Sequence, residues 1–501
     1  MARPTVRSIA CALAALGVFV HARLASAADI ATQLGTPGDA TFSAECPAGN
    51  VPGSADDGIP ACLLAGTAQE SRCLHRVDID PVEFPHAVCS DGTSPSFYVR
   101  EASTLADENR WVIHLQGGGG CTDEATCRAR WCGDNGSYTA AVMSNDWNDD
   151  GIVDRPEEAW ILGISADVPA NDFASWNHVY VPYCTSDLWL GREGDVDLGS
   201  FSVDANGHTY LVAVRKMLRQ VAAPWTSVNG YTMPVLDDAE EIIFSGTSAG
   251  GYGALQNGDW FLDVFPGARV GLVIDGAMDI DPQTLGLFGV WEETTNWPYS
   301  SARLATWDAM WQPGGWWHEI DAFIDEDCRG QYEAGGSLEV CTSSSWLLRL
   351  ALGGVPIVQT PTFLRMDLED PVLSQWITGP NPDGHDVRLG NNGPVPTLQD
   401  FTEMMRETMV QLAADPQTDI SVHAPRCGQH VGLEHGNAFG GWTTDDTSDV
   451  LPRVPQLMDE TFRDALWLWF NPGGAFVRER RIDSDEVDPI TGNPIDYSSC
   501  P

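Results

Sequence analysis

Positively charged residues are scarce in this chain of 501 residues, which has 27 lysines and arginines against 71 acidic residues and a formal net charge of -44. Lys216 is the only lysine. A protein this negative repels polyanions until salt screens its field, which argues against nucleic acid, anionic membrane surfaces and unmodified polyanionic polysaccharide as partners. Because 43% of the residues are hydrophobic and 9% are aromatic, the charge does not indicate disorder.

Long apolar runs are missing as well. The apolar stretch from Ile9 to Val20 follows Arg3 and Arg7 and is shorter than the roughly 20 residues that a membrane-spanning helix needs. Its charged start and the small residues that end it predict a cleaved secretory signal over residues 1–27. A membrane anchor is the alternative, and it fits the length less well. We therefore expect an exported chain, extracellular or periplasmic, that does not span a membrane.

Cys-x-x-Cys pairs are absent, so the usual spacing of a zinc site is not present. Thirteen cysteines less Cys11, which lies in the predicted signal, leave twelve. An even number in an exported chain indicates disulfides. Cys328 and Cys341 are near enough in the chain to pair locally, while the sequence does not determine the other pairs.

Short apolar runs rich in β-branched residues recur along the chain and end in small or polar residues. They cover residues 110–121, 178–184, 241–248 and 269–277. Such runs are typical of parallel strands that are buried on both faces. Helical patterns lie between them at 200–221 and 251–265. This alternation predicts an α/β domain with a mostly parallel sheet flanked by helices.

Composition predicts the boundaries of the domain. We expect an irregular, disulfide-tied segment over 28–94, the main domain over 95–478 and a polar tail over 479–501. Within the domain, insertions are expected at 144–158 and 280–345. The second insertion is rich in tryptophan. It is either a lid whose rings stack on a sugar or an acyl chain, or a helical region held together by aromatic packing.

A Gly-x-Ser-x-Gly pentapeptide places Ser248 between Gly246 and Gly250. A serine hydroxyl becomes a nucleophile only when a base takes its proton and when it projects to where substrate can reach it. A strand, a sharp turn and a helix provide that projection, and the residues around Ser248 match this order. A plain turn of small residues is the alternative. The flanking patterns favour a nucleophile.

Acyl transfer also needs amides that bind the developing oxyanion. The amide of Ala249, directly after the serine, is one candidate. The glycine run 117–120 follows the first strand pattern, and its Gly119 and Gly120 amides are the others, because glycine lets the backbone approach a ligand closely. A flexible turn is the alternative. A phosphate-binding loop is disfavoured, since no Gly-Lys-Ser/Thr follows the run.

The general base and its supporting acid are expected after the serine in the chain. The candidate acids are Asp275, which closes a strand pattern, and Asp370. The candidate bases are His423, His430 and His435. Spacing alone does not choose among them. A metal-dependent site built on His430 and His435 is disfavoured because the His-Glu-x-x-His spacing is absent.

Several motifs together resemble the pectin acetylesterase and Notum carboxylesterase family over about residues 95–440: "LQGGGGC", "VMSNDW", "NDFASWNHVYVPYCTSDLWLG", "FSGTSAGGYGAL" and "CGQH". The resemblance implies an α/β-hydrolase fold and a Ser-Asp-His triad that removes acyl groups from oxygen, with Ser248 as nucleophile. It favours His430, which follows a Cys-x-x spacing, and it favours Asp370, which follows Phe363, over Asp275. The neighbouring Asp367 stays open as an alternative acid.

The resemblance implies a secreted serine carboxylesterase that needs no cofactor for catalysis and acts on O-acyl esters, O-acetyl groups of a polysaccharide in the first instance. Relatives carry an aromatic residue where this chain has Gly120 followed by Cys121, which leaves the natural ester open. One alternative is a carboxylesterase for long acyl chains. Another is a non-catalytic, calcium-dependent carbohydrate-binding protein.

A second motif, "DWNDDGIVDRPE" at 146–157, matches the calcium-loop pattern Asp-x-Asn-x-Asp-Gly-x₅-Glu. Calcium prefers several oxygen ligands around it. The pattern offers Asp146, Asn148, Asp150, the carbonyl of Ile152, Asp154 through a water and Glu157. We expect a structural calcium site. The alternative is a solvated loop in a chain that is rich in acids.

Overall fold

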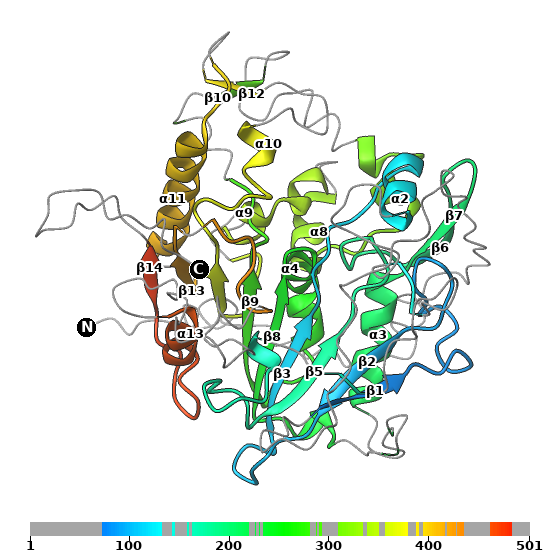
Figure 1. Cartoon of the computed structure of the whole chain (residues 1–501), viewed down its shortest axis with the longest axis vertical. Coiled ribbons are helices and arrows are strands. Elements are labelled where there is room, and N and C mark those ends of the chain that lie inside the picture. Colours follow the sequence, from blue (N-terminus) through cyan, green and yellow to red (C-terminus); the bar gives the residue numbers. More distant parts are fainter. Residues whose placement is uncertain are drawn as a thin grey trace, which may run out of the picture. The chain divides into compact units, whose positions relative to one another are not determined.

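The computed structural model describes residues 73–132, 143–145, 158–159, 163–219, 226, 230, 234–280, 287, 290–292, 309–333, 338–349, 356–378, 387–389, 394–415, 418–426, 428–434 and 461–482. They all belong to the compact unit that spans 34–501. Within this part of the chain, a ten-stranded sheet runs in the order β14-β13-β11-β9-β8-β3-β5-β2-β1-β4 (Figure 1).

Seven neighbouring strands of this sheet are parallel. They are β14 (Arg480–Ile482), β13 (Ile420–Ala424), β11 (Thr362–Arg365), β9 (Arg269–Asp275), β8 (Glu241–Thr247), β3 (Arg110–Leu115) and β5 (Asn177–Val181). The sheet continues with antiparallel β2 (Ser96–Arg100), β1 (Leu74–Asp78) and β4 (Glu158–Ala159). This mostly parallel sheet confirms the predicted fold class.

Two short antiparallel pairs lie outside the main sheet. They are β6 (Glu193–Asp197) with β7 (Ser202–Ala205), and β10 (Val290–Glu292) with β12 (Val387–Leu389). The α-helices with described bounds are α2 (Glu124–Trp131), α3 (Gly207–Leu218), α4 (Ala249–Leu262), α7 (Trp316–Glu319), α8 (Glu326–Tyr332), α9 (Ser344–Leu347), α10 (Gln375–Thr378), α11 (Leu398–Ala414) and α13 (Phe462–Phe470). Single 3-10 turns occur at η2 (Gly163–Ser165), η3 (Leu236–Asp238) and η5 (Leu338–Thr342).

Alternate residues of the parallel strands are buried on opposite faces of the sheet, as the period of a strand requires. On one face, Ile113 and Phe244 belong to a core shared with α3, α4 and α11. On the other face, Val112 and Ile243 belong to a separate core with α13. Helices therefore cover both faces, which explains why these strands read as continuous apolar runs.

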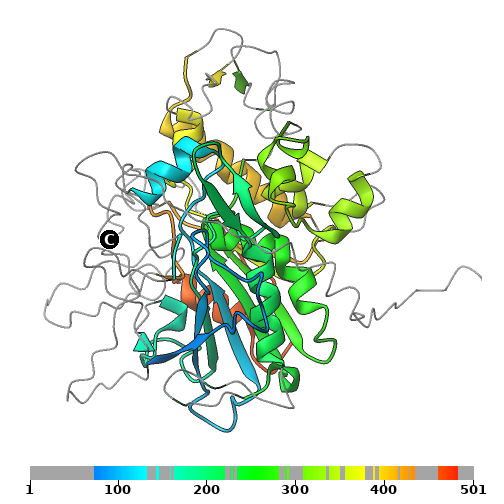
Figure 2. The same ribbon diagram turned by 90° about the vertical axis from the view of Figure 1, so that its right-hand side faces the viewer.

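The helices α2, α8 and α9 lie beyond one end of the sheet in both views (Figures 1 and 2). Side-chain bonds tie this region to α4, which follows β8. Tyr252 of α4 donates to the carbonyl oxygen of Thr342 at 2.6 Å, and Gln256 donates to the carbonyl oxygen of Cys341 at 2.7 Å. The segments around η5 are thus fixed to the helix that begins beside Ser248.

The strands expected at 110–121, 178–184, 241–248 and 269–277 are present as β3, β5, β8 and β9, and the helix expected at 251–265 is α4. The expectation for 200–221 is wrong at its start. There, β7 precedes α3 and pairs with β6, with Val203 buried in a small core. Tertiary pairing has overridden the helical pattern.

The irregular segment expected over 28–94 is also wrong for β1. Leu74 and Val77 are buried, while the residues between them are only partly covered, so no clean alternation marks the strand in the sequence. Pairing with β2 and β4 on both sides makes it a strand. Position in the sheet, and not local pattern, determines this element.

Disulfides join Cys89 to Cys184, Cys121 to Cys127 and Cys328 to Cys341. The last pair confirms the local pairing predicted from the sequence. Cys73 and Cys132 are disulfide-bonded as well. The pair Cys121–Cys127 closes a small ring directly after the glycine run.

The tryptophan-rich insertion is described in part. Trp316 and Trp317 of α7 are each 7% exposed and pack with Leu190, Val196 and Val203 beside the β6–β7 pair. For these two rings the packing interpretation therefore holds.

Across the described part of the chain, no helix has both the length and the apolar character that crossing a bilayer requires.

Candidate active site

Ser248 occupies a sharp turn between β8 and α4. Its backbone has φ 52° and ψ -120°, a conformation that costs about 1–3 kcal/mol for a residue with a side chain. The flanking glycines explain how the turn closes. A Cβ on Gly246 would lie 2.0 Å from the carbonyl oxygen of Gly250, and one on Gly250 would lie 2.1 Å from that of Leu115. The Gly-x-Ser-x-Gly pattern is therefore required by the tight packing of the strand, the turn and the helix.

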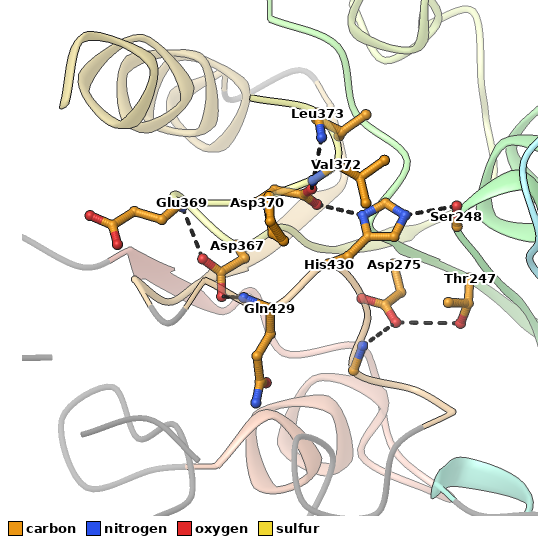
Figure 3. A network of polar contacts seen from close by, with 12 residues as sticks. Thr247, Ser248, Asp275, Asp367, Glu369, Asp370, Val372, Leu373, Gln429 and His430 are labelled. Carbon is orange, nitrogen blue, oxygen red and sulfur yellow. Dashed lines mark hydrogen bonds and ion pairs between the residues drawn. The ribbon is translucent and has the colours of Figure 1, made fainter. Parts of the chain in front are cut away.

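The imidazole of His430 lies between Ser248 and Asp370 (Figure 3). Its Nε2 is 2.8 Å from Ser248 Oγ, and its Nδ1 is 2.7 Å from Asp370 Oδ2. An ionised carboxylate only accepts hydrogen bonds, so the Nδ1 atom carries the proton and the Nε2 lone pair faces the serine hydroxyl. This is the tautomer that can take a proton from Ser248.

Asp370 is fully buried and held by its own loop. Its Oδ1 accepts hydrogen bonds from the amides of Val372 at 2.8 Å and Leu373 at 2.9 Å, which leaves Oδ2 directed at the imidazole. These two amides fix how the carboxyl group is turned. The carboxylate therefore has a single orientation toward His430.

The other candidates from the sequence lie elsewhere. The carboxylates of Asp275 and Asp367 bind backbone amides of the loop that carries His430, and no contact joins either carboxylate to the imidazole (Figure 3). His423 is buried in β13, where its ring stacks on Phe462. His435 lies outside the described residues. The structure thus brings together Ser248, His430 and Asp370.

The glycine run lies against the serine. A Cβ on Gly117 would lie 3.1 Å from Ser248 Cβ, and Gly118 and Gly119 have φ 136° and 64°, values that side chains disfavour. Ala249 is the first residue of α4. The first amides of a helix lack intrahelical partners and favour negative charge. The turn therefore offers amide donors beside the serine hydroxyl.

A strained loop around residues 186–189 packs against the glycine run. Ser186, Leu188 and Trp189 all have positive φ. The buried carboxylate of Asp187 holds this loop by accepting hydrogen bonds from the amides of Trp189, Gly191 and Gly207 and from the hydroxyl of Thr185. The carbonyl oxygen of Ser186 accepts from the amide of Cys121 at 2.9 Å. Burial raises the pKa of Asp187 above its ordinary value, while these hydrogen bonds oppose the rise.

Sequence reasoning gave Asp187 no role, although it stands inside "YCTSDLW". It also missed Glu434. Glu434 Oε1 is 3.1 Å from Nε2 of the buried His114, and it accepts weakly from the amide of Gly117 at 3.4 Å. This side chain links the loop of His430 to the glycine run. The partners of Glu434 lie 320 and 317 residues away in the chain, so no local pattern marks this acid. Asp187 bonds mainly to near neighbours and also to Gly207, 20 residues away.

Tyr252 and Gln256 lie on α4, which begins directly after Ser248, and Gln256 donates to the Tyr252 hydroxyl at 3.2 Å. Burial raises the pKa of Tyr252 well above its ordinary value, so the phenol stays protonated and donates its hydrogen bond to the carbonyl oxygen of Thr342.

The predicted calcium ligands between 146 and 157 lie outside the described residues. Within the described ranges, no group of three or more His, Cys, Asp or Glu side chains could hold a metal ion.

The chain is similar to several known proteins. A family model described as Pectinacetylesterase matches residues 73–294. The chain is 26% identical over 403 residues to Palmitoleoyl-protein carboxylesterase NOTUM of Drosophila melanogaster, covering 80% of this chain and 50% of that protein. It is 28% identical over 403 residues to Pectin acetylesterase 7 of Arabidopsis thaliana, covering 78% and 86%.

The chain resembles the solved structure of the Wnt deacylase Notum from Drosophila with a TM-score of 0.55 and 21% identity, over 86% of this chain and 100% of that one. This likeness shows the fold. The chain spans half or less of the length of several curated relatives that it matches, at 50%, 39% and 29%.

Proposed function

Because the chain belongs to the pectin acetylesterase and Notum carboxylesterase family, we propose that it is a serine carboxylesterase that hydrolyses O-acyl esters. The observation that carries this proposal is the continuous contact from Ser248 through His430 to Asp370, at 2.8 and 2.7 Å. A nucleophile, a base and an acid that orients the base are the parts that acyl transfer from oxygen requires.

In the proposed reaction, His430 Nε2 takes the proton of Ser248 as Oγ attacks the acyl carbonyl. Asp370 stabilises the imidazolium that forms, and the amides of Gly119, Gly120 and Ala249 bind the tetrahedral oxyanion. His430 then gives the proton to the leaving alcohol. Water, activated by His430, attacks the acyl-enzyme and releases the carboxylic acid. No cofactor takes part in these steps.

We propose that the natural substrate is an O-acetylated carbohydrate. The similarity to Pectin acetylesterase 7, over 86% of that protein, supports this choice of substrate. The strongly negative charge favours an acetylated polymer of low charge over a bare polyanion. Disulfides such as Cys89–Cys184 support our proposal that the chain is exported.

The length of the acyl chain tests the proposed substrate. Across p-nitrophenyl esters from acetate to decanoate, kcat/KM should be highest for acetate and should fall by about tenfold or more by decanoate, because a pocket that closes on two carbons cannot hold a longer tail. Initial rates at matched ester concentrations below KM measure this. A maximum at octanoate or beyond would support the long-chain alternative instead.

The motif at 146–157 also supports a structural calcium site, which we propose for this chain. Adding calcium at about 100 times Kd to protein treated with EDTA should stabilise it by about 2.7 kcal/mol, visible as a higher thermal midpoint. Magnesium at the same concentration serves as the control, because it fits such a loop poorly. If Glu157→Gln gives the same calcium response as the wild type, the loop is not the site.

A further inference from the structure

Three charged side chains of the site take no part in the proposed reaction. Asp275 ends β9, Arg365 ends β11 and Asp367 follows β11. All three are buried, with exposed fractions of 0%, 2% and 0%. Burial of charge is costly unless the charge is paired and hydrogen-bonded, so their arrangement calls for an explanation.

Asp275 contacts the backbone of Ser248 and the loop that carries His430. On one side, its Oδ2 accepts hydrogen bonds from the amides of Gly432 and Leu433, each at 2.7 Å, two and three residues after His430. On the other side, its carbonyl oxygen accepts from the amide of Ser248 at 2.7 Å. The same Oδ2 is 3.3 Å from Thr247 Oγ1. One residue thus binds the nucleophile turn and the loop of the base (Figure 3).

Arg365 holds the backbone of His430 itself. Its Nη1 donates to the carbonyl oxygen of His430 at 3.0 Å and to that of Gln429 at 3.2 Å, and it is 3.3 Å from Asp275 Oδ1. A Cβ on Gly276 would lie 2.3 Å from the same carbonyl oxygen of His430. The backbone of His430 therefore packs directly against Gly276, the residue that follows β9.

Asp367 holds the loop on the side that precedes His430. Its Oδ1 accepts from the amide of Gly428 at 2.9 Å, and its Oδ2 accepts from the amide of Gln429 at 3.1 Å. Its Oδ2 is also 3.5 Å from Arg365 Nη2. The loop is therefore fixed immediately before and after the catalytic base.

The described residues 428–434 contain no helix or strand, so their backbone groups need partners from elsewhere in the protein. The three charged side chains supply those partners. The position of the imidazole depends on the position of the His430 backbone. A shift of the loop would therefore lengthen the 2.8 Å contact between His430 Nε2 and Ser248 Oγ. A misplacement of about 1 Å can cost about 10²-fold in rate.

We infer that Asp275 is a positioning residue that sets the separation of His430 from Ser248, with Arg365 and Asp367 completing a brace around the loop of residues 428–434. This inference rests on the proposed function, because it assigns Asp275 a role in the same reaction. The sequence made Asp275 a candidate for the triad acid. The inference assigns it the role of positioning His430 instead.

The test is the Asp275→Asn variant. The amide keeps the shape of the carboxylate, and its oxygen can still accept from the amides of Gly432 and Leu433. Its NH2 group then faces the Arg365 guanidinium, a donor against a donor, so the ionic contact that holds Arg365 on the loop is lost. We expect kcat for p-nitrophenyl acetate to fall by about 10²-fold with KM within about twofold. The rate at which a fluorophosphonate labels Ser248 should fall by a similar factor, since that reaction also needs His430 beside the serine.

Asp259→Asn is a matched control for a general loss of stability. Asp259 also accepts from two backbone amides, those of Gln359 at 2.7 Å and Thr360 at 3.0 Å, but it lies near the end of α4 that is away from Ser248. Its thermal midpoint should fall while kcat well below that midpoint stays unchanged. A merely structural role for Asp275 would give the same result as this control.

Asp367→Asn provides a second variant in case Asp275→Asn does not fold. It removes charge on the other side of His430, and we expect kcat to fall by about tenfold with KM unchanged. If the folded variants keep kcat within twofold of an active wild type, the positioning role is overturned and the proposed function stands. If the wild type neither hydrolyses the ester nor reacts with fluorophosphonate at Ser248, the proposed function itself is overturned.

Discussion

Ser248→Ala should lower kcat/KM for p-nitrophenyl acetate by about 10⁴-fold or more and should leave the fold intact. Ser248 Oγ is the atom that His430 Nε2 faces at 2.8 Å, and alanine has no atom that can form the acyl-enzyme. The alanine methyl occupies the same turn, so the backbone is not required to move. Steady-state rates, with circular dichroism to verify folding, measure the effect.

Ser200→Ala is the matched control, because Ser200 is exposed and its hydroxyl bonds the side chains of Arg128 and Glu124 at the surface. Its activity should equal that of the wild type. Intact-mass measurement after fluorophosphonate treatment should show one adduct on the wild type and on Ser200→Ala but none on Ser248→Ala. Full turnover by Ser248→Ala, in material free of other esterases, would disprove the assigned nucleophile.

Asp370→Asn should lower kcat by about 10³- to 10⁴-fold. An asparagine at this position can turn its NH2 group toward His430 Nδ1, which favours the tautomer whose Nε2 carries the proton and cannot accept from Ser248. The two amides that bind Asp370 Oδ1, from Val372 and Leu373, favour this orientation because they need an acceptor. Rates at saturating ester isolate kcat.

The three acids should rank in their effects on kcat. Asparagine at Asp370 should cost the most, at Asp275 less and at Asp367 least, since only Asp370 contacts the imidazole. Thermal midpoints measured in parallel separate loss of folding from loss of chemistry. A larger fall in kcat for Asp275→Asn or Asp367→Asn than for Asp370→Asn would assign the triad acid differently.

Much of the fold could be predicted from the sequence because the parallel strands are buried on both faces. The runs that became β3, β5, β8 and β9 are mostly apolar and buried, and helical patterns lie between some of them. The strand β1 lacks that signature, since only Leu74 and Val77 are well buried. Its place in the sheet depends on pairing with β2 and β4, which no local pattern encodes.

In the candidate site, too, some features could be predicted from the local sequence and others could not. The turn at Ser248 is recognisable because its glycines are required locally by close backbone contacts. The choice among Asp275, Asp367 and Asp370 could not be made from spacing, because all three follow the carboxyl ends of the neighbouring strands β9 and β11 and so gather at one edge. Which oxygen reaches the imidazole depends on a difference of a few ångströms that only the three-dimensional arrangement fixes.

The disulfide between Cys121 and Cys127 begins where the glycine run ends. A covalent bond at that point restrains the end of residues 117–120, so in the proposed reaction an oxidising compartment would help to order the amides that bind the oxyanion as well as the fold. Chain made in a reducing cytosol would lack this restraint. Production of the protein in an oxidising host therefore affects its chemistry as well as its yield.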